Sequence, residues 1–183
     1  MIKTMEQAER DAALHVADIM AAAARTAPKG SGKDKIVTAI LTGEEQMTLS
    51  KVMTEAGTEF GEAFFLRDAK NVADSHCILM VGAISDPFGF MENCSMCGFE
   101  NCVEMTKAGA NCAFNITDLG IAVGSAVSVA ADHRIDNRVM YSAGKSFLRM
   151  EIFPEDVKVC YGIPLYTGSK SIYFDRGPGA VLK

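Results

Sequence analysis

Helical and extended patterns of hydrophobic residues alternate along most of the chain. Residues 5–25 are rich in Ala, Glu and Met and contain neither Gly nor Pro, which predicts a helix. A Pro and two Gly within residues 28–32 end it. Residues 36–41 and 77–84 are short apolar runs of the kind found in buried strands. The second run is apolar throughout, so we expect it to be the central strand of a sheet.

The middle of the chain predicts further helices. Residues 44–57 have an acidic first turn and apolar positions at helical spacing. Residues 63–74 are ambiguous: the first four fit a strand or a helix end, and the last seven a short helix or turn. Thr117 and Asp118 predict an N-terminal cap for a long helix over residues 119–131. That helix has almost no polar face, so we expect it in the core or in a subunit interface.

The last third predicts a helix over residues 142–150, a strand over residues 157–165 and an extended arm over residues 166–183. We expect the arm to pack on another surface, such as a second subunit. The order of elements is helix, strand, helix, strand, inserted segment, helix, helix, strand and arm. This order predicts a three-layer α/β (α+β) arrangement. A chain of 183 residues is long enough for one well-packed domain, 1–183.

Composition and charge narrow the class of protein. Apolar residues make up 49% and charged residues 22%, an ordinary balance for a soluble protein. The net charge of −5 gives no support for a nucleic-acid partner. The charged start does not resemble a secretory leader, and the longest apolar stretches, residues 77–84 and 120–131, are too short to span a bilayer. We therefore expect a cytoplasmic protein without a membrane partner.

Four of the six cysteines gather within residues 91–114, in the pattern Cys94-x2-Cys97-Gly-x3-Cys102-x9-Cys112. Closely spaced thiolates in a turning segment are suitable ligands for a soft metal. A [4Fe–4S] cluster takes four cysteines from a short segment, whereas structural zinc usually takes two well-separated C-x2–4-C pairs. One such pair followed by two single cysteines favours the cluster. Zinc, or four buried or disulfide-bonded cysteines, are the alternatives.

The other reactive side chains have simpler interpretations. Cys77 and Cys160 lie within predicted apolar strands, so we expect both to be small buried hydrophobic residues. His15, His76 and His133 are widely separated and show no spacing typical of metal ligands or of a base beside a nucleophile. Acyl-transfer chemistry therefore has little support.

The cysteine segment resembles the four-cysteine [4Fe–4S] motif of electron-transfer and corrinoid-protein subunits. In that motif a Cys-Gly pair follows the first ligand, and a helix separates the third ligand from the fourth. Residues 103–111 can supply that helix. The resemblance implies that Cys94, Cys97, Cys102 and Cys112 bind the cluster.

The remainder of the chain resembles FMN-dependent nitroreductases. Residues 22–28 (AAARTAP), 118–122 (DLGIA) and 153–157 (FPEDV) occur in the order of that family's Ala-Pro segment, central helix and last core strand. Together with the cysteines, the chain resembles the uncharacterised family of ferredoxin-domain-containing prokaryotic proteins along its whole length. This resemblance implies a nitroreductase-like three-layer sandwich, a homodimer, and an inserted iron–sulfur segment at about residues 91–114.

The nitroreductase pattern is incomplete at the flavin site. Nitroreductases hold the FMN phosphate with an arginine-rich motif at the start of the domain, but only Arg10 and Arg25 precede the first loop here. Residues 30–35 replace the family's Asn and Gln-Pro-Trp, and the chain contains no Trp. A Gly-rich basic loop can still bind an anion. The candidate flavin or phosphate contacts are Arg25, Lys29 and Gly30, followed by Lys170 and Arg176; the alternative is a helix stop with a solvated basic face.

Two classes of function follow from these observations. In the first, the protein is an iron–sulfur redox protein that transfers electrons, or a nitroreductase-like oxidoreductase assisted by FMN, with an unidentified electron donor or acceptor. In the second, it is a non-catalytic module whose cluster, or zinc, senses redox state or supports a loop. The basic loop and the family resemblance favour the first class, and the absent flavin arginines favour the second. Whether the protein is an enzyme stays open.

Overall fold

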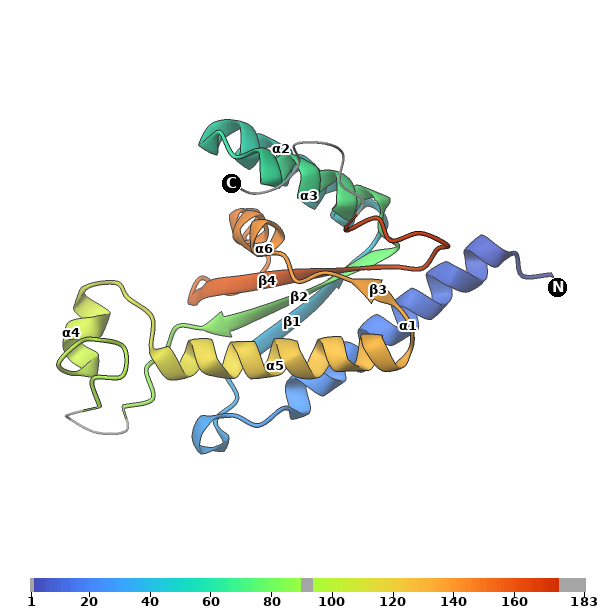
Figure 1. Cartoon of the computed structure of the whole chain (residues 1–183). Helices are drawn as coiled ribbons and strands as arrows, with labels where there is room; N and C mark the ends of the chain where they lie inside the picture. Colours follow the sequence, from blue (N-terminus) through green and yellow to red (C-terminus); the bar gives the residue numbers. More distant parts are fainter. Residues whose placement is uncertain (1, 90–93, 175–183) are drawn as a thin grey trace.

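A four-stranded antiparallel sheet forms the centre of the protein, which is represented by a computed structural model that describes residues 2–89 and 94–174 (Figure 1). The strands lie in the order β1-β2-β4-β3. They are β1 (Ile36–Leu41), β2 (Cys77–Ile84), β3 (Asp136–Asn137) and β4 (Val157–Tyr166). The predictions for β1 and β2 are confirmed at both ends, β4 is one residue longer than predicted, and β3 was not predicted.

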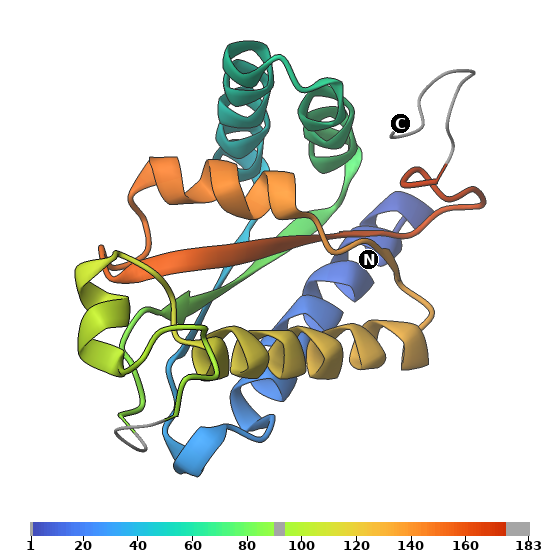
Figure 2. The same cartoon turned by 60° about the vertical axis from the view of Figure 1, so that its left-hand side comes forward.

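Helices cover both faces of the sheet. On one face lie α1 (Met5–Thr26) and α5 (Ala113–Asp132). On the other lie α2 (Gly43–Phe60), α3 (Ala63–Asp74) and α6 (Tyr141–Phe147) (Figures 1 and 2). The predicted three-layer arrangement is thereby confirmed.

Strand β2 separates two hydrophobic cores. Leu79 and Val81 pack with the helices α1 and α5 on one face, whereas Ile78 and Met80 pack with α2 and α6 on the other. Successive side chains of a strand point to opposite faces, so a strand covered on both sides must be apolar at every position. This explains the uninterrupted apolar run and confirms β2 as a central strand.

Helix α6 lies unusually close to β4. A Cβ atom added to Gly144 would lie 1.8 Å from the carbonyl oxygen of Cys160, far inside any real contact. Gly144 therefore lets the helix backbone rest on the strand. After α6 the chain continues as a short 3-10 turn, η2 (Leu148–Met150).

Helix α5 begins six residues earlier than predicted, at Ala113, with Cys112 in the N-cap position. Asp118 does not cap it. Its buried carboxylate instead accepts hydrogen bonds from the backbone N–H of Gly30, at 3.0 and 3.1 Å. The capping prediction considered only neighbouring residues and was wrong for Asp118, because its partner lies 88 positions away.

Only one face of α5 is in the core, although almost the whole helix is apolar. Ile116 and Ile121, on the other side, are 37% and 42% exposed. With 20 residues, α5 is the single helix of the described chain that is long and apolar enough to cross a bilayer, which corrects the shorter predicted stretch. Its buried face packs against α1 and the sheet, as in the core helix of a globular protein.

Two other predictions are refined. The ambiguous residues 63–66 form the first turn of α3. Helix α4 (Cys102–Lys107) is shorter than the predicted residues 103–111, and Gly109 follows it with a positive φ of 66°. Positive φ is compatible with Gly and ends a helix readily.

The described part of the C-terminal arm packs on its own chain. Tyr173 is buried, and its hydroxyl lies 2.8 Å from the Ser75 hydroxyl just after α3. Arg138 donates a hydrogen bond to the Tyr173 carbonyl at 3.2 Å. Residues 175–183 lie outside the described part, so packing against a second subunit stays a prediction for them.

Candidate metal centre

The cysteine segment projects from the edge of the layered body where β2 ends and β4 begins (Figures 1 and 2). The chain leaves β2 at Ile84 and returns to the body at Cys112, directly before α5. Helix α4 lies within the segment. Residues 90–93 are outside the described part; all four clustered cysteines are inside it.

Local turns fix the backbone around the first three cysteines. Ser95 and Gly98 have positive φ angles of 44° and 84°, and the Gly98 N–H donates to the Ser95 carbonyl at 2.8 Å. This tight turn contains Cys97. Asn101 then caps α4, because its side-chain oxygen accepts from the N–H groups of the next turn at 3.0 Å. Cys102 is therefore fixed as the first residue of α4.

All four cysteines line one small cavity of about 20 Å³. Each thiol is free. Cys112 is buried and the other three are half-buried. The cavity wall is otherwise largely apolar and includes Met96, Phe99, Met105, Ala113 and Phe114.

Zinc and an iron–sulfur cluster require different spacings of the four thiols. Within residues 2–89 and 94–174, no three Cys, His, Asp or Glu side chains are close enough to hold one metal ion. Tetrahedral zinc, with Zn–S bonds of about 2.3 Å, requires neighbouring sulfurs only ~3.8 Å apart. A cubane is held by thiolates on four different irons, which spreads the sulfurs further apart. The four thiols share one cavity without forming a tight group of three, and which metal they bind stays a prediction.

A small apolar cluster forms part of the cavity wall. Phe88, Met105 and Cys112 are buried together, and the ring of Phe114 meets the ring of Phe88 edge-on at 6.0 Å between centroids. This cluster is separate from the two cores beside the sheet. An apolar wall limits the access of water, which is one of the factors that sets the potential of an iron–sulfur centre.

The N-terminus of α5 meets the cavity at its fourth cysteine. Cys112 is the N-cap of this 20-residue helix, and its side chain accepts no hydrogen bond from the first turn. The positive end of the helix dipole favours negative charge at this position. A thiolate-bound cluster is negatively charged, so the donor set and its surroundings suit such a group.

Cys77 and Cys160 are not part of this site. They are buried on opposite faces of the sheet, Cys77 with α1 and α5 and Cys160 with α2 and α6. Burial raises the pKa of each thiol to about 12, which disfavours the thiolate that metal binding needs. Both are small buried residues, as predicted.

The predicted phosphate contacts have partners within the protein. Arg25 pairs with the Asp34 carboxylate at 2.8 Å. The ammonium of Lys29, with only 4% of its side chain exposed, donates to the carbonyls of Ala24, Arg25 and Ala27 at 2.9, 2.8 and 2.7 Å. Lys29 therefore caps the C-terminal end of α1. A lysine just after a helix often has this role.

Gly30, the other predicted phosphate contact of this loop, also has a partner within the protein. The Gly30 N–H points to Asp118, and the loop forms a 3-10 turn, η1 (Gly30–Gly32). A phosphate here would have to compete with the carboxylates of Asp34 and Asp118. Lys170 is exposed on the arm, and Arg176 lies outside the described residues.

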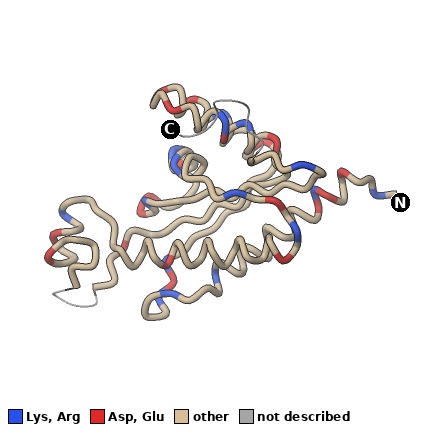
Figure 3. Tube along the Cα trace, in the orientation of Figure 1, with Lys and Arg blue, Asp and Glu red and all other residues tan. Residues whose placement is uncertain are grey.

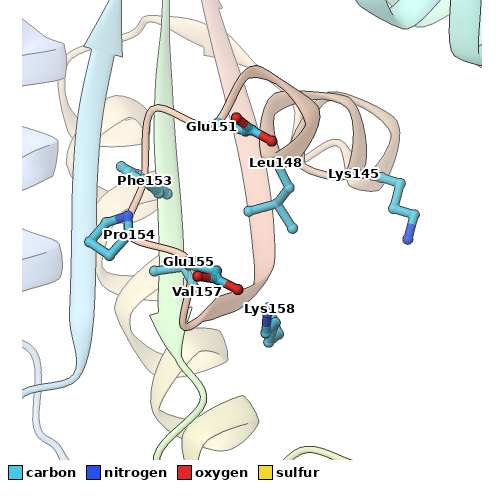
Figure 4. A pocket seen from close by; sticks show the side chains of 8 residues that line it. All are labelled: Lys145, Leu148, Glu151, Phe153, Pro154, Glu155, Val157 and Lys158. Carbon is cyan, nitrogen blue, oxygen red and sulfur yellow. The ribbon is translucent and has the colours of Figure 1, made fainter. Parts of the chain in front are cut away.

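Another cleft, of about 550 Å³, lies between α6, η2 and the start of β4 (Figure 4). Its charged residues are two Lys and two Glu, so it has no strong preference for either sign of charge. Its lining consists of Lys145, Leu148, Glu151, Phe153, Pro154, Glu155, Val157 and Lys158. Basic and acidic residues are also interspersed over the rest of the described trace (Figure 3).

Comparison with solved structures defines the class of fold. The chain resembles a nitroreductase with bound FMN from Desulfitobacterium hafniense, with a TM-score of 0.57 and 14% identity over 86% of this chain and 79% of that one. It also resembles the NADPH:FMN oxidoreductase of Vibrio harveyi complexed with NAD⁺, with a TM-score of 0.56 and 12% identity over 85% and 60% of the two chains. The fold is that of nitroreductases, as predicted.

Sequence comparison then gives the family. A protein of Archaeoglobus fulgidus, described as uncharacterized, is 44% identical over 168 residues, which cover 87% of this chain and 89% of that protein. The profile of the family described as "Uncharacterized protein containing a ferredoxin domain" matches residues 108–176, which include Cys112 and α5. The chain belongs to this family, and the predicted resemblance is confirmed.

Proposed function

We propose that the protein is an iron–sulfur redox protein that holds a [4Fe–4S] cluster through Cys94, Cys97, Cys102 and Cys112. The observation that carries the proposal is that these four free thiols line one cavity with a largely apolar wall. Membership of a family with a ferredoxin domain supports a redox role. The cluster would supply one-electron chemistry, and the protein would hold and tune it.

The surroundings of the thiols favour electron transfer over a purely structural role. Three of the four cysteines are only half-buried, and Met96 and Val103 beside them are 58% and 61% exposed. A group held this close to the surface can exchange electrons with a partner protein. The N–H groups at the start of α5 stabilise added negative charge, which favours the reduced state.

An FMN-assisted oxidoreductase is the second candidate. The D. hafniense nitroreductase of the same fold carries FMN, which supports a flavin here. The internal partners of Arg25, Lys29 and Gly30 weigh against a phosphate at the first loop. Flavin released on denaturation of the purified protein would support this candidate, and its absence would favour an electron carrier.

The exposed face of α5 supports a homodimer. Besides Ile116 and Ile121, this face carries Gly120 and Gly124, and a Cβ atom at either Gly would meet nothing within 4 Å. Apolar and small residues on an exposed helix allow another helix to approach closely. The free thiols support a reducing compartment such as the cytoplasm.

The ligand assignment is tested by replacing each clustered cysteine with Ser. Protein purified without oxygen is expected to show the broad visible absorption of an iron–sulfur cluster, which dithionite bleaches. The substitutions at positions 94, 97, 102 and 112 should abolish or strongly reduce it. Cys160→Ala is the matched control, because this buried thiol lies in the sheet, and it should keep the spectrum. A Cys112→Ser variant with full absorption would refute the assignment.

A further inference from the structure

Lys35, the residue before β1, is a buried lysine beside the cysteine segment. Only 10% of its side chain is exposed. Its ammonium donates to the Asp86 carbonyl at 2.5 Å, lies 2.8 Å from the Asp86 carboxylate, and stands 4.2 Å from the centroid of the Phe88 ring. A buried cation is costly unless it has partners of this kind. The ammonium is therefore a fixed part of the turn that leads from β2 to the cysteines.

The ring of Phe88 connects this ammonium to the cavity. The ring belongs with Met105 and Cys112 to the small apolar cluster. The Lys35 ammonium lies over the same ring, and a Cβ added to Gly30 would be 3.3 Å from it. The position of Cys112 thus depends on the Phe88 ring, and the position of that ring depends on its contact with the Lys35 ammonium.

Hydrogen bonds tie the two ends of the cysteine segment to the same point. The Asn115 amide, in the first turn of α5, donates to the carbonyls of Ile84 and Asp86 at 3.1 and 2.8 Å. Ser85 donates to the Asn111 side chain at 3.0 Å. The Asp86 carbonyl therefore accepts from both Asn115 and the buried ammonium. This single carbonyl joins the start of β1, the exit from β2 and the first turn of α5.

We propose that Lys35 is a positioning residue of the metal centre, an inference that rests on the proposed cluster. Its ammonium fixes the Asp86 turn and the Phe88 ring, and these hold Cys112 at the cavity. Although it is paired with the Asp86 carboxylate at 2.8 Å, its positive charge would also favour an electron added to a bound cluster. The Lys35 side chain does not line the cavity and would act on a bound cluster through its neighbours.

The first test uses metal-free protein. Alkylation of each cysteine by iodoacetamide is followed by peptide mass mapping in Lys35→Met, Lys35→Arg and wild-type protein. Lys35→Met should speed the alkylation of Cys112, and Lys35→Arg, which keeps a cation, should restore the wild-type rate. Lys29→Met is the matched control, because Lys29 is an equally buried lysine of the same loop that caps α1 instead. Phe88→Leu gives a second route if Lys35→Met does not fold, and it should also expose Cys112.

The second test uses cluster-loaded protein. Lys35→Met should lose iron to a chelator about 10-fold faster than wild type, the usual scale for groups that orient metal ligands. Its reduction potential should be more negative, and Lys35→Arg should restore it. Wild-type alkylation rates in both Lys35→Met and Phe88→Leu, or an equal effect of Lys29→Met, would overturn the proposal. If wild type takes up no cluster, the proposed function fails, whereas the alkylation test still decides the role of Lys35.

Discussion

The close contact between α6 and β4 gives a sharp prediction for Gly144→Ala. The added Cβ would lie 1.8 Å from the Cys160 carbonyl oxygen, and ordinary contact begins at 3.4 Å, so α6 would have to move away by about 1.6 Å. Ala143 and Phe147, both fully buried between helix and sheet, would move with it. Overpacking of this severity costs about 3 kcal/mol or more. The better helix propensity of Ala returns about 1 kcal/mol, so we expect a net loss of about 2 kcal/mol.

The assay is urea unfolding of the metal-free protein under reducing conditions, followed by circular dichroism. Lys145→Ala is the control, because Lys145 is the next residue of the same helix and is exposed. It should change the free energy of unfolding by no more than about 0.5 kcal/mol. A Gly144→Ala variant as stable as wild type would show that α6 does not rest on β4, and the three-layer packing would need revision.

Three further predictions concern stability and assembly. Asp118→Ala should lower the free energy of unfolding by about 1–3 kcal/mol in urea, because it leaves the Gly30 N–H without an acceptor; an unchanged value would exclude this bond. Ile121→Glu should convert a dimer to a monomer in light scattering, and an unchanged mass would remove α5 from the interface. The thiols of Cys77 and Cys160 have folded pKa values of about 12 against 9.0 unfolded, so they stabilise the fold fully below pH 9 and lose this effect as pH rises toward 12. The double Ala variant should show a smaller loss of stability over that interval, and an identical loss would contradict the assignment.

Local patterns were sufficient to predict the layers of the fold. Strand β2 was predicted to the residue because its burial on both faces leaves an uninterrupted apolar run. Helix α1 was predicted to within one residue because Pro28 and the glycines after it stop any helix. The grouping of four cysteines was also apparent, since they are close in sequence and of one chemical type, whereas the metal site assigned to them stays a prediction. These signals lie within a single segment of the chain.

The features that were mispredicted depend on distant partners. Asp is a residue type that often caps helices. The Asp118 carboxylate nevertheless accepts from the Gly30 N–H, and α5 begins at Ala113. Lys35 gave no signal at all, because its role depends on a turn 51 positions away. Such tertiary partners cannot be inferred from one sequence without knowledge of the fold.

The central claim is that the four cysteines hold a [4Fe–4S] cluster. The most direct measurement is an assay of iron, zinc and acid-labile sulfide on one sample of wild-type protein purified without oxygen. The account predicts about four irons and four sulfides per chain, with no stoichiometric zinc. One zinc per chain without sulfide would mean that the cysteines form a structural zinc site, and the redox function proposed for them would be wrong.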